Sequence, residues 1–277
     1  YGLIDPYWGG VNAVVESMRN VVSAGATPHA LSDCLCFGNP EKLYQMWEFV
    51  EAVRGVSDAC HAITLKDHPG YATPIIAGNV SFYNESKNGA IPPSPIVSCL
   101  GRLKDVNKTV PAHFQETDST LIMIGDRKNE LGGSVYYSLK NELGANVPKP
   151  NLEEVKNQLF ALTDCIDDGL VLSCHDIADG GIASALAEMT FRNSIGCNVN
   201  IESDLSPDKI LFSETGGFVL EVLPKNVDVI KSIFSNYGLD VFDIGSTGGE
   251  SIEINGITDV YVNETKKAWT NGLREKL

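Results

Sequence analysis

Strand-length apolar segments alternate with amphipathic helical segments along most of the chain, and this alternation limits the fold more than any other feature. Residues 31–36, 73–79 and 119–125 are short apolar runs, whereas the apolar positions of 11–22 and 43–56 recur at helical spacing. Interleaved strands and helices are typical of α/β proteins. Because the strands are short and alternating, we expect an α/β (α+β) fold with mixed or antiparallel sheets rather than one doubly wound parallel sheet.

Glycine and proline mark the ends of these elements, beginning with Gly25, which follows the first helix. Further helices are expected at 43–62, from Gly132 to about Leu143, at 152–165, after Gly181 and at 227–234. Further strands are expected at 95–103, 169–176, near Val199, and at 218–222, 241–244 and 252–254. The charged segment 104–118 has little periodicity, so we predict two lobes, 1–112 and 113–277.

Charge and hydropathy exclude two classes of partner. The chain has 21 Lys and Arg against 36 Asp and Glu, a net charge of −15, which disfavours a nucleic-acid binder. No apolar run reaches the roughly 18–20 residues that a membrane helix needs. A phosphate-bearing ligand must therefore be held by backbone N–H groups, a divalent cation or a few local cations.

Seven cysteines, an odd number without C-x-x-C spacing, indicate reduced thiols in a cytoplasmic protein. Cys34 and Cys36 would supply half of a zinc site, but no second cysteine pair or nearby histidine completes it. We therefore expect the cysteines to be small buried apolar side chains.

Three segments combine polar side chains with glycine at a predicted strand end, where α/β proteins bind polar ligands. In the first, 32–42, Asp33 can bind a ribose, a base or magnesium, with the following helix N-terminus facing phosphate. The spacing favours a simpler explanation, in which Asn39 caps that helix and Pro40 occupies its first turn.

The second segment, 77–86, contains Gly78, Asn79 and Ser81, neutral groups suited to magnesium phosphate, and an Asn-rich turn explains it equally well. The third, 173–181, contains His175, Asp176 and Asp179, which can bind a metal or move a proton. Helix capping by one of these aspartates is the favoured alternative there. Neither G-x-G-x-x-G nor a P-loop motif occurs.

Several longer strings are more distinctive than these motifs. They are DPYWGGVNAVVESMRNVVSAGATPHALSDCLCFGNPEK, EAVRGVSDACHA, TPIIAGNVSFYNES, DRKNELGGSVYY, HDIADGGIASALAEMTF and LFSETGG. Together they resemble, in order and over nearly the whole chain, the second half of the large-subunit type of phosphoribosylformylglycinamidine synthase. That family is related to the aminoimidazole ribonucleotide synthetases.

The resemblance implies a repeat of two α/β lobes within an ATP-dependent carbon–nitrogen ligase. Its reaction is the amidation of formylglycinamide ribonucleotide in purine synthesis, with ATP and Mg²⁺ as cofactors and ammonia from glutamine. The implied partners are the N-terminal half of the same enzyme, a glutaminase subunit, a small bridging subunit, and a second copy of this chain. The chain resembles the second repeat without the opening strands of its first lobe.

Residue by residue, the resemblance assigns ATP binding to Asp33 and Gly78, and magnesium binding to Asn79. Ser81 matches a substrate-contact position. By analogy with the first repeat, Asp176 is a candidate metal ligand and Glu214 a candidate substrate contact.

The resemblance assigns no catalytic residue to this chain, because the family's general-base histidines lie in the first repeat. We therefore expect this half to be inactive alone. The loop 63–72 is longer than usual and is expected to reshape the pocket near Gly78. Two alternatives remain: a scaffold repeat that has lost nucleotide affinity and docks the glutaminase, and a complete aminoimidazole ribonucleotide synthetase, which the matching strings disfavour.

Overall fold

The computed structural model describes residues 1–272, which form two compact units. Unit 1 comprises Tyr1–Val22, Ala26–Val106 and Glu130–Thr163. Unit 2 comprises Ser23–Gly25, Asn107–Asn129 and the chain from Asp164 onward. The chain thus crosses from unit 1 to unit 2 near residue 106, returns at 130, and leaves again within helix α4 (Leu152–Asp167). The lobe boundary after residue 112 stays a prediction.

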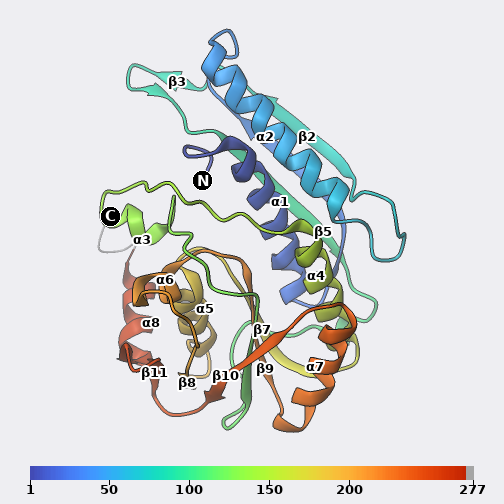
Figure 1. The fold of residues 1–277 in the computed structure, drawn as a ribbon, viewed down its shortest axis with the longest axis vertical. Helices are drawn as coiled ribbons and strands as arrows, with labels where there is room; N and C mark the ends of the chain where they lie inside the picture. Colours follow the sequence, from blue (N-terminus) through green and yellow to red (C-terminus); the bar gives the residue numbers. More distant parts are fainter. Residues whose placement is uncertain (273–277) are drawn as a thin grey trace. The chain divides into compact units, whose positions relative to one another are not determined.

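Unit 1 contains a three-stranded sheet with strand order β2-β1-β5. Its strands are β1 (Thr27–Cys36), β2 (Ile75–Ser81) and β5 (Ser94–Arg102). Strand β1 pairs in parallel with β2 and antiparallel with β5, so the sheet is mixed, as predicted. Helices α1 (Pro6–Ser23) and α2 (Leu43–Ala62) are the long helices beside this sheet (Figure 1).

The two helices cross with almost no side chain between them. A Cβ atom on Gly10 would overlap the carbonyl oxygen of Ala52, and one on Gly55 would overlap that of Tyr7. On its sheet side, α2 packs Ala52 and Phe49 against Leu35 and Phe37 at the end of β1. Glycine at the crossing therefore sets how closely α2 approaches α1.

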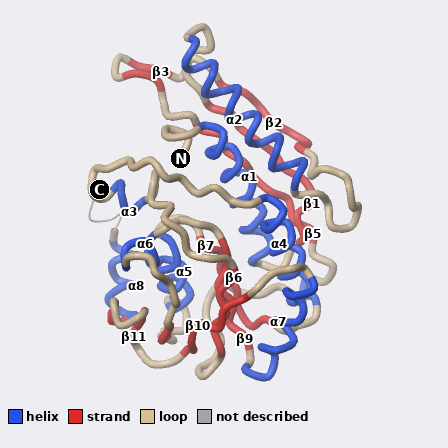
Figure 2. The backbone as a smooth tube through the Cα atoms, in the orientation of Figure 1, coloured by secondary structure: helices blue, strands red, loops and turns tan. Residues whose placement is uncertain are grey.

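Unit 2 is built on a seven-stranded sheet of order β12-β11-β8-β10-β6-β9-β7. All neighbours are antiparallel except β8 and β11. The strands are β6 (Thr120–Ile124), β7 (Val171–Ile177), β8 (Cys197–Val199), β9 (Gly217–Val222), β10 (Val241–Thr247), β11 (Ser251–Ile254) and β12 (Thr258–Tyr261). Its helices are α5 (Gly181–Thr190), α6 (Pro207–Phe212), α7 (Val227–Asn236) and α8 (Val262–Asn271), and Figure 2 separates them from the strands by colour.

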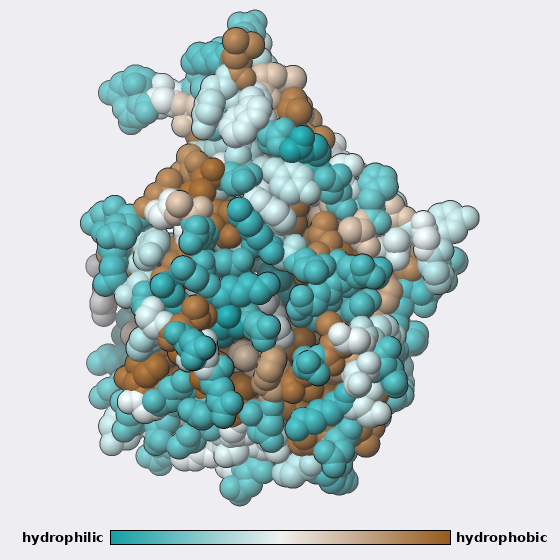
Figure 3. Space-filling model, in the orientation of Figure 1, coloured by the Kyte–Doolittle hydropathy of each residue, from teal (hydrophilic) through white to brown (hydrophobic). Residues whose placement is uncertain are grey.

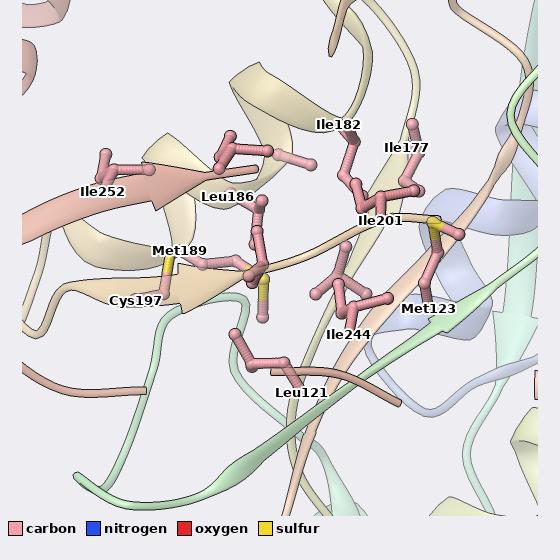
Figure 4. Packing of buried hydrophobic residues seen from close by; sticks show 14 of the residues in the cluster. Leu121, Met123, Ile177, Ile182, Leu186, Met189, Cys197, Ile201, Ile244 and Ile252 are labelled. Atoms are coloured by element: carbon pink, nitrogen blue, oxygen red, sulfur yellow. The ribbon is translucent and has the colours of Figure 1, made fainter. Parts of the chain in front are cut away.

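The core of unit 2 lies between the sheet and helix α5. Ile182, Leu186 and Met189 of α5 are fully buried against strand residues that include Leu121 and Ile244 (Figure 4). These are the apolar positions whose helical spacing predicted the helix. Burying each such side chain contributes about 1.5–3 kcal/mol, which explains why these positions set the helix's orientation.

Two of the elements expected from the sequence have different bounds in the structure. A helix was expected from Gly132 to about Leu143, but the structure has only the short helix α3 (Val135–Ser138) there. The chain folds back on itself in this region, because the N–H of Gly132 donates to the carbonyl of Asn146 and the N–H of Gly133 donates to that of Leu143. Strand β1 begins four residues earlier than expected, since Thr27 and Pro28 also pair with β5. After β2, residues 85–90 form a short hairpin of β3 (Glu85–Ser86) and β4 (Gly89–Ala90).

The visible face in Figure 3 is mainly polar, with separate apolar patches. No helix among residues 1–272 is both long and apolar enough to cross a membrane.

Candidate functional site

Asp33 and Gly78 lie side by side on the parallel strands β1 and β2. The Asp33 carboxylate reaches across its neighbour, so that a Cβ atom at residue 78 would overlap its Oδ1 atom. Glycine is thus needed at this position to leave room for the carboxylate. The structure brings together the two residues that the resemblance assigns to nucleotide binding.

A cavity of about 260 Å³ opens beside Asp33, between β1 and α2. Its walls come from both strands, from α2 and from the loop 63–73: Asp33, Leu35, Val53, Val56, Ser57, Cys60, His61, Ala72, Thr73 and Ile75. Burial raises the pKa of the Asp33 carboxyl. Burial, with the charge of Asp33, also raises the pKa of the Cys60 thiol to about 11. The cavity therefore offers one acidic acceptor in an otherwise largely apolar surface.

The loop 63–73 forms one wall of this cavity through Ala72 and Thr73. The Thr73 hydroxyl donates to the carbonyl of Ile63 at 2.7 Å, which closes the base of the loop. Lys66 Nζ donates to the carbonyl of Phe160 at 2.7 Å and to the Thr163 hydroxyl at 3.2 Å. The loop is therefore fixed to α4 as well as to α2.

Asn79 and Ser81 lie on the other face of the sheet, because successive strand residues point to opposite faces. Asn79 is exposed, and its amide Nδ2 donates to Cys34 Sγ at 3.4 Å. The Ser81 hydroxyl donates to Asn84 Oδ1 at 3.3 Å. The four predicted residues of unit 1 thus share one stretch of β1 and β2, divided between two faces.

The simpler explanation for Asn39 is wrong in its detail. Helix α2 begins at Leu43, with Lys42 at the cap position, so Asn39 and Pro40 both precede the helix. Asn39 Oδ1 instead accepts the N–H of Glu41 at 2.9 Å and fixes the turn that leads into α2.

In unit 2, Glu214 holds the turn in front of α5. Its Oε1 accepts the backbone N–H of Gly180 at 2.9 Å, and Glu214 is only 3% exposed. Gly180 is the N-cap of α5 in a left-handed conformation, so capping by Asp176 or Asp179 is wrong. Asp176 is buried on β7, paired with Phe218 of β9.

His175 is paired with an acidic side chain rather than with a metal-binding cluster. Its Nδ1 lies 2.7 Å from the carbonyl oxygen of Asp176, and its Nε2 lies 3.1 Å from Glu188 Oε2. Both neighbours are acceptors, which favours the doubly protonated ring. Burial lowers the pKa of His175, but the bonds to Glu188 and Asp176 outweigh it, so the net shift is upward. The bond to His175 lowers the pKa of Glu188.

This pair predicts a pH-dependent contribution to the stability of unit 2. A histidine with a raised folded-state pKa stabilises fully below its unfolded pKa, and this contribution is lost as pH rises through the folded-state value. We expect the parent to lose more stability than His175→Gln as the pH rises above the ordinary histidine pKa of 6.5. Urea unfolding in EDTA, followed by hydrogen exchange in peptides of β7 and α5, measures the difference. Equal pH slopes for both proteins would contradict the pairing.

A larger cavity, of about 850 Å³, lies in unit 2 at the ends of β6 and β8 and was not foreseen from the sequence. Charged residues of both signs line it, among them Asp126, Arg127, Lys128, Glu202 and Asp243. The Arg127 guanidinium also donates to the carbonyl of Gly216 at 3.2 Å. The only feature of the sequence that could have indicated this cavity was the charged cluster Asp126-Arg127-Lys128, which follows a strand.

Neither Asn79 nor Asp176 lies in a ready-made cluster of acidic, histidine or cysteine side chains among the described residues. Among residues 1–272, no three or more His, Cys, Asp or Glu side chains are grouped to hold a metal ion. A cation at Asn79 would thus take most of its ligands from phosphate and water, which is how Mg²⁺ commonly binds with nucleotides. The exposed carboxamide of Asn79 is compatible with that mode.

Comparison with known families identifies the family to which the chain belongs. Residues 1–103 match the AIR synthase related protein N-terminal domain, and residues 116–255 match the C-terminal domain of the same family. The chain belongs to the AIR synthase related family.

Within that family, the chain is similar to particular curated relatives. It is 42% identical over 284 residues to the phosphoribosylformylglycinamidine synthase subunit PurL of Methanothrix thermoacetophila, covering 100% of this chain and 37% of the relative. It is 38% identical to the same subunit of Moorella thermoacetica, covering 99% and 37%. The chain therefore spans little more than a third of the length of these relatives.

Solved structures agree on the fold. Thermotoga maritima PurL complexed with FGAR superposes with a TM-score of 0.74 at 20% identity, covering 95% of this chain and 43% of that one. The hydrogenase maturation protein HypE in complex with ATP gives 0.67 at 14% identity, covering 91% and 78%. The predicted family and the mixed α/β fold are both confirmed.

Proposed function

We propose that this chain is the nucleotide-binding second repeat of a phosphoribosylformylglycinamidine synthase. In this role it binds a magnesium nucleotide and contributes half of an enzyme that amidates formylglycinamide ribonucleotide with ATP and ammonia. The names of its relatives support the activity, and the Thermotoga PurL structures complexed with ATP and with FGAR support the ligands.

The observation that carries the proposal is the carboxylate of Asp33 lying over Gly78 at the mouth of a small apolar cavity. An apolar slot fits the faces of a nucleobase, and a carboxylate accepts hydrogen bonds from a base amino group or a ribose hydroxyl. Net charge is −15, so the phosphates need a local cation rather than a positive surface. Asn79, one residue beyond Gly78, lies on the opposite face of the sheet, so in this proposal the phosphates extend past the end of β2 to that face. There Asn79 supplies an oxygen for Mg²⁺, which when bound offsets phosphate charge.

The exposed edge of strand β2 suits the binding of the N-terminal half of the enzyme. Strand β2 is an edge strand of the three-stranded sheet, and its residues 75–80 are all exposed, including Ile76 at 61% and Val80 at 48%. A long exposed edge with apolar side chains is a template for strand addition. We assign this edge to the N-terminal half of the longer enzyme, which also supplies the general base.

The substrate contacts follow from the same placement. Ser81 is at the end of β2, where the added half would lie, and it takes the substrate-contact role. Asp176 and Glu214 keep their proposed metal and substrate roles in unit 2. A glutaminase and a small bridging subunit complete the proposed assembly by delivering ammonia.

Calorimetric titration of the folded chain with Mg-ADP and a non-hydrolysable Mg-ATP analogue tests the proposal. We expect binding by the parent, and at least tenfold weaker binding, about 1.4 kcal/mol, in Asp33→Ala and Asn79→Ala. Asn88→Ala, an exposed asparagine on the nearby hairpin, is the matched control and should bind like the parent. Excess EDTA should weaken binding by the parent more than by Asn79→Ala.

A folded parent that binds neither nucleotide would overturn the nucleotide site in this chain and leave the scaffold repeat as the better explanation. Unchanged affinity in Asp33→Ala would place the nucleotide elsewhere.

A further inference from the structure

Cys34 and Cys36 form a close pair of thiols on β1. They are two residues apart on one strand, so their side chains share a face, and their Sγ atoms lie 3.6 Å apart. Both are partly exposed, which corrects the expectation that all the cysteines are buried. They share the face of the sheet that carries Asn79 and Ser81, their register partners on β2.

The two cysteines are free thiols, and their spacing suits a chelate. Residues two apart on a strand have Cα atoms roughly 6.6 Å apart, near the upper limit for a disulfide bridge. Metal–thiolate bonds of about 2.3 Å to sulfurs 3.6 Å apart enclose an angle of about 100°, close to tetrahedral. Two thiolates can therefore bind one cation without movement of the backbone.

The chemistry of the pair selects the kind of cation. Thiolates are soft ligands that prefer ions such as Zn²⁺ and Cd²⁺ to Mg²⁺ or Ca²⁺. The Asn79 carboxamide already contacts Cys34 Sγ at 3.4 Å, and a half-turn of that amide would present its oxygen instead of its nitrogen. Water completes the coordination, as in zinc sites that keep an open position.

The other cysteines are poor competitors. Cys60, Cys165, Cys174 and Cys197 are buried. Burial raises the pKa of Cys60 and Cys99 to about 11 and that of Cys197 to about 12, and the bond to Cys34 also raises the pKa of Cys36, so exposure and pairing rather than thiol acidity favour the Cys34–Cys36 pair.

We propose that Cys34 and Cys36 form a binding site for one thiophilic divalent cation of the Zn²⁺ and Cd²⁺ class, with Asn79 as a neighbouring third ligand. Binding forms two metal–sulfur bonds, breaks two S–H bonds and releases two protons to solvent, with no change of oxidation state. Asn79 is also the proposed magnesium ligand, so the two cations would compete for its carboxamide, but the two thiolates bind their cation without a nucleotide.

Titration of the reduced, metal-free 277-residue chain with Cd²⁺ tests this site through the ultraviolet thiolate-to-cadmium charge-transfer band. We expect one Cd²⁺ per chain with release of two protons. Cys34→Ser and Cys36→Ser should each bind at least about tenfold more weakly, because one thiolate is lost. Cys99→Ser is the matched control on the adjacent strand β5 and should match the parent.

Two results would overturn the site. One is a parent that gives no charge-transfer band at one equivalent of Cd²⁺. The other is a folded Cys34→Ser/Cys36→Ser double variant that keeps the parent's band and stoichiometry, which would place the ion on another thiol. Circular dichroism of each variant confirms that the fold is intact.

Discussion

Glu221→Gln should cost unit 2 about 3 kcal/mol of its free energy of unfolding. Glu221 is fully buried, one residue before the end of β9, and its carboxylate accepts three hydrogen bonds. The donors are the backbone N–H groups of Gln115 and Glu116, each at 2.8 Å, and the Ser173 hydroxyl at 2.7 Å. An amide in the same place must turn its NH₂ group toward at least one donor, which leaves the buried NH₂ group facing an N–H group with no acceptor between them.

Urea unfolding read by hydrogen exchange in peptides of β7 and β9 measures this loss. Glu250→Gln makes the same chemical change at an exposed position and should lie within about 0.5 kcal/mol of the parent. A loss at Glu221 no larger than that of the control would mean that the three bonds contribute little. In this expectation Glu221 links residues 115–116 and the edge strand β7 to its neighbour β9.

Glu221 also illustrates what the sequence could and could not predict. The apolar run around it correctly predicted strand 218–222, because a short continuous apolar run is typical of a strand buried along its whole length, as β9 is. A single charged residue in such a run was the only sign of a buried hydrogen-bond network in the sequence. Two of the groups that donate to Glu221, the Ser173 hydroxyl and the Glu116 N–H, lie 48 and 105 residues away in the chain. Contacts of that separation depend on topology, which periodicity does not contain.

The candidate site, too, was predictable from the sequence only in part. Strand-to-glycine patterns located Asp33, Gly78 and Asn79, and the parallel pairing of β1 with β2 places them in one stretch. Their distribution over two faces of the sheet follows from alternation along the strand, once the register is known. In contrast, the short α3 was missed because the carbonyls of 143 and 146 that pair with Gly132 and Gly133 are set by tertiary folding, which overrode local helix propensity.

Gly55→Ala should destabilise unit 1 by about 1–3 kcal/mol, although the same change normally stabilises a helix. In the middle of an exposed helix, replacing glycine with alanine gains about 1 kcal/mol from backbone entropy. At Gly55 the added methyl would overlap the backbone carbonyl of Tyr7 in α1, an atom that cannot rotate away as a side chain can. The sign of the change in stability therefore distinguishes the close crossing from ordinary helix propensity.

The measurement is urea unfolding followed by hydrogen exchange in peptides of α1 and α2, with Met46→Ala as the control. Met46 is a partly exposed residue of the same helix, and its truncation should change stability by no more than about 0.5 kcal/mol. A more stable Gly55→Ala protein would mean that α1 and α2 lie farther apart than the structure has them. Helix α2 also forms a wall of the cavity beside Asp33, so its displacement in Gly55→Ala should weaken Mg-ADP binding as well. A destabilised Gly55→Ala protein that binds Mg-ADP with the parent's affinity would mean that the helix crossing does not affect the nucleotide site.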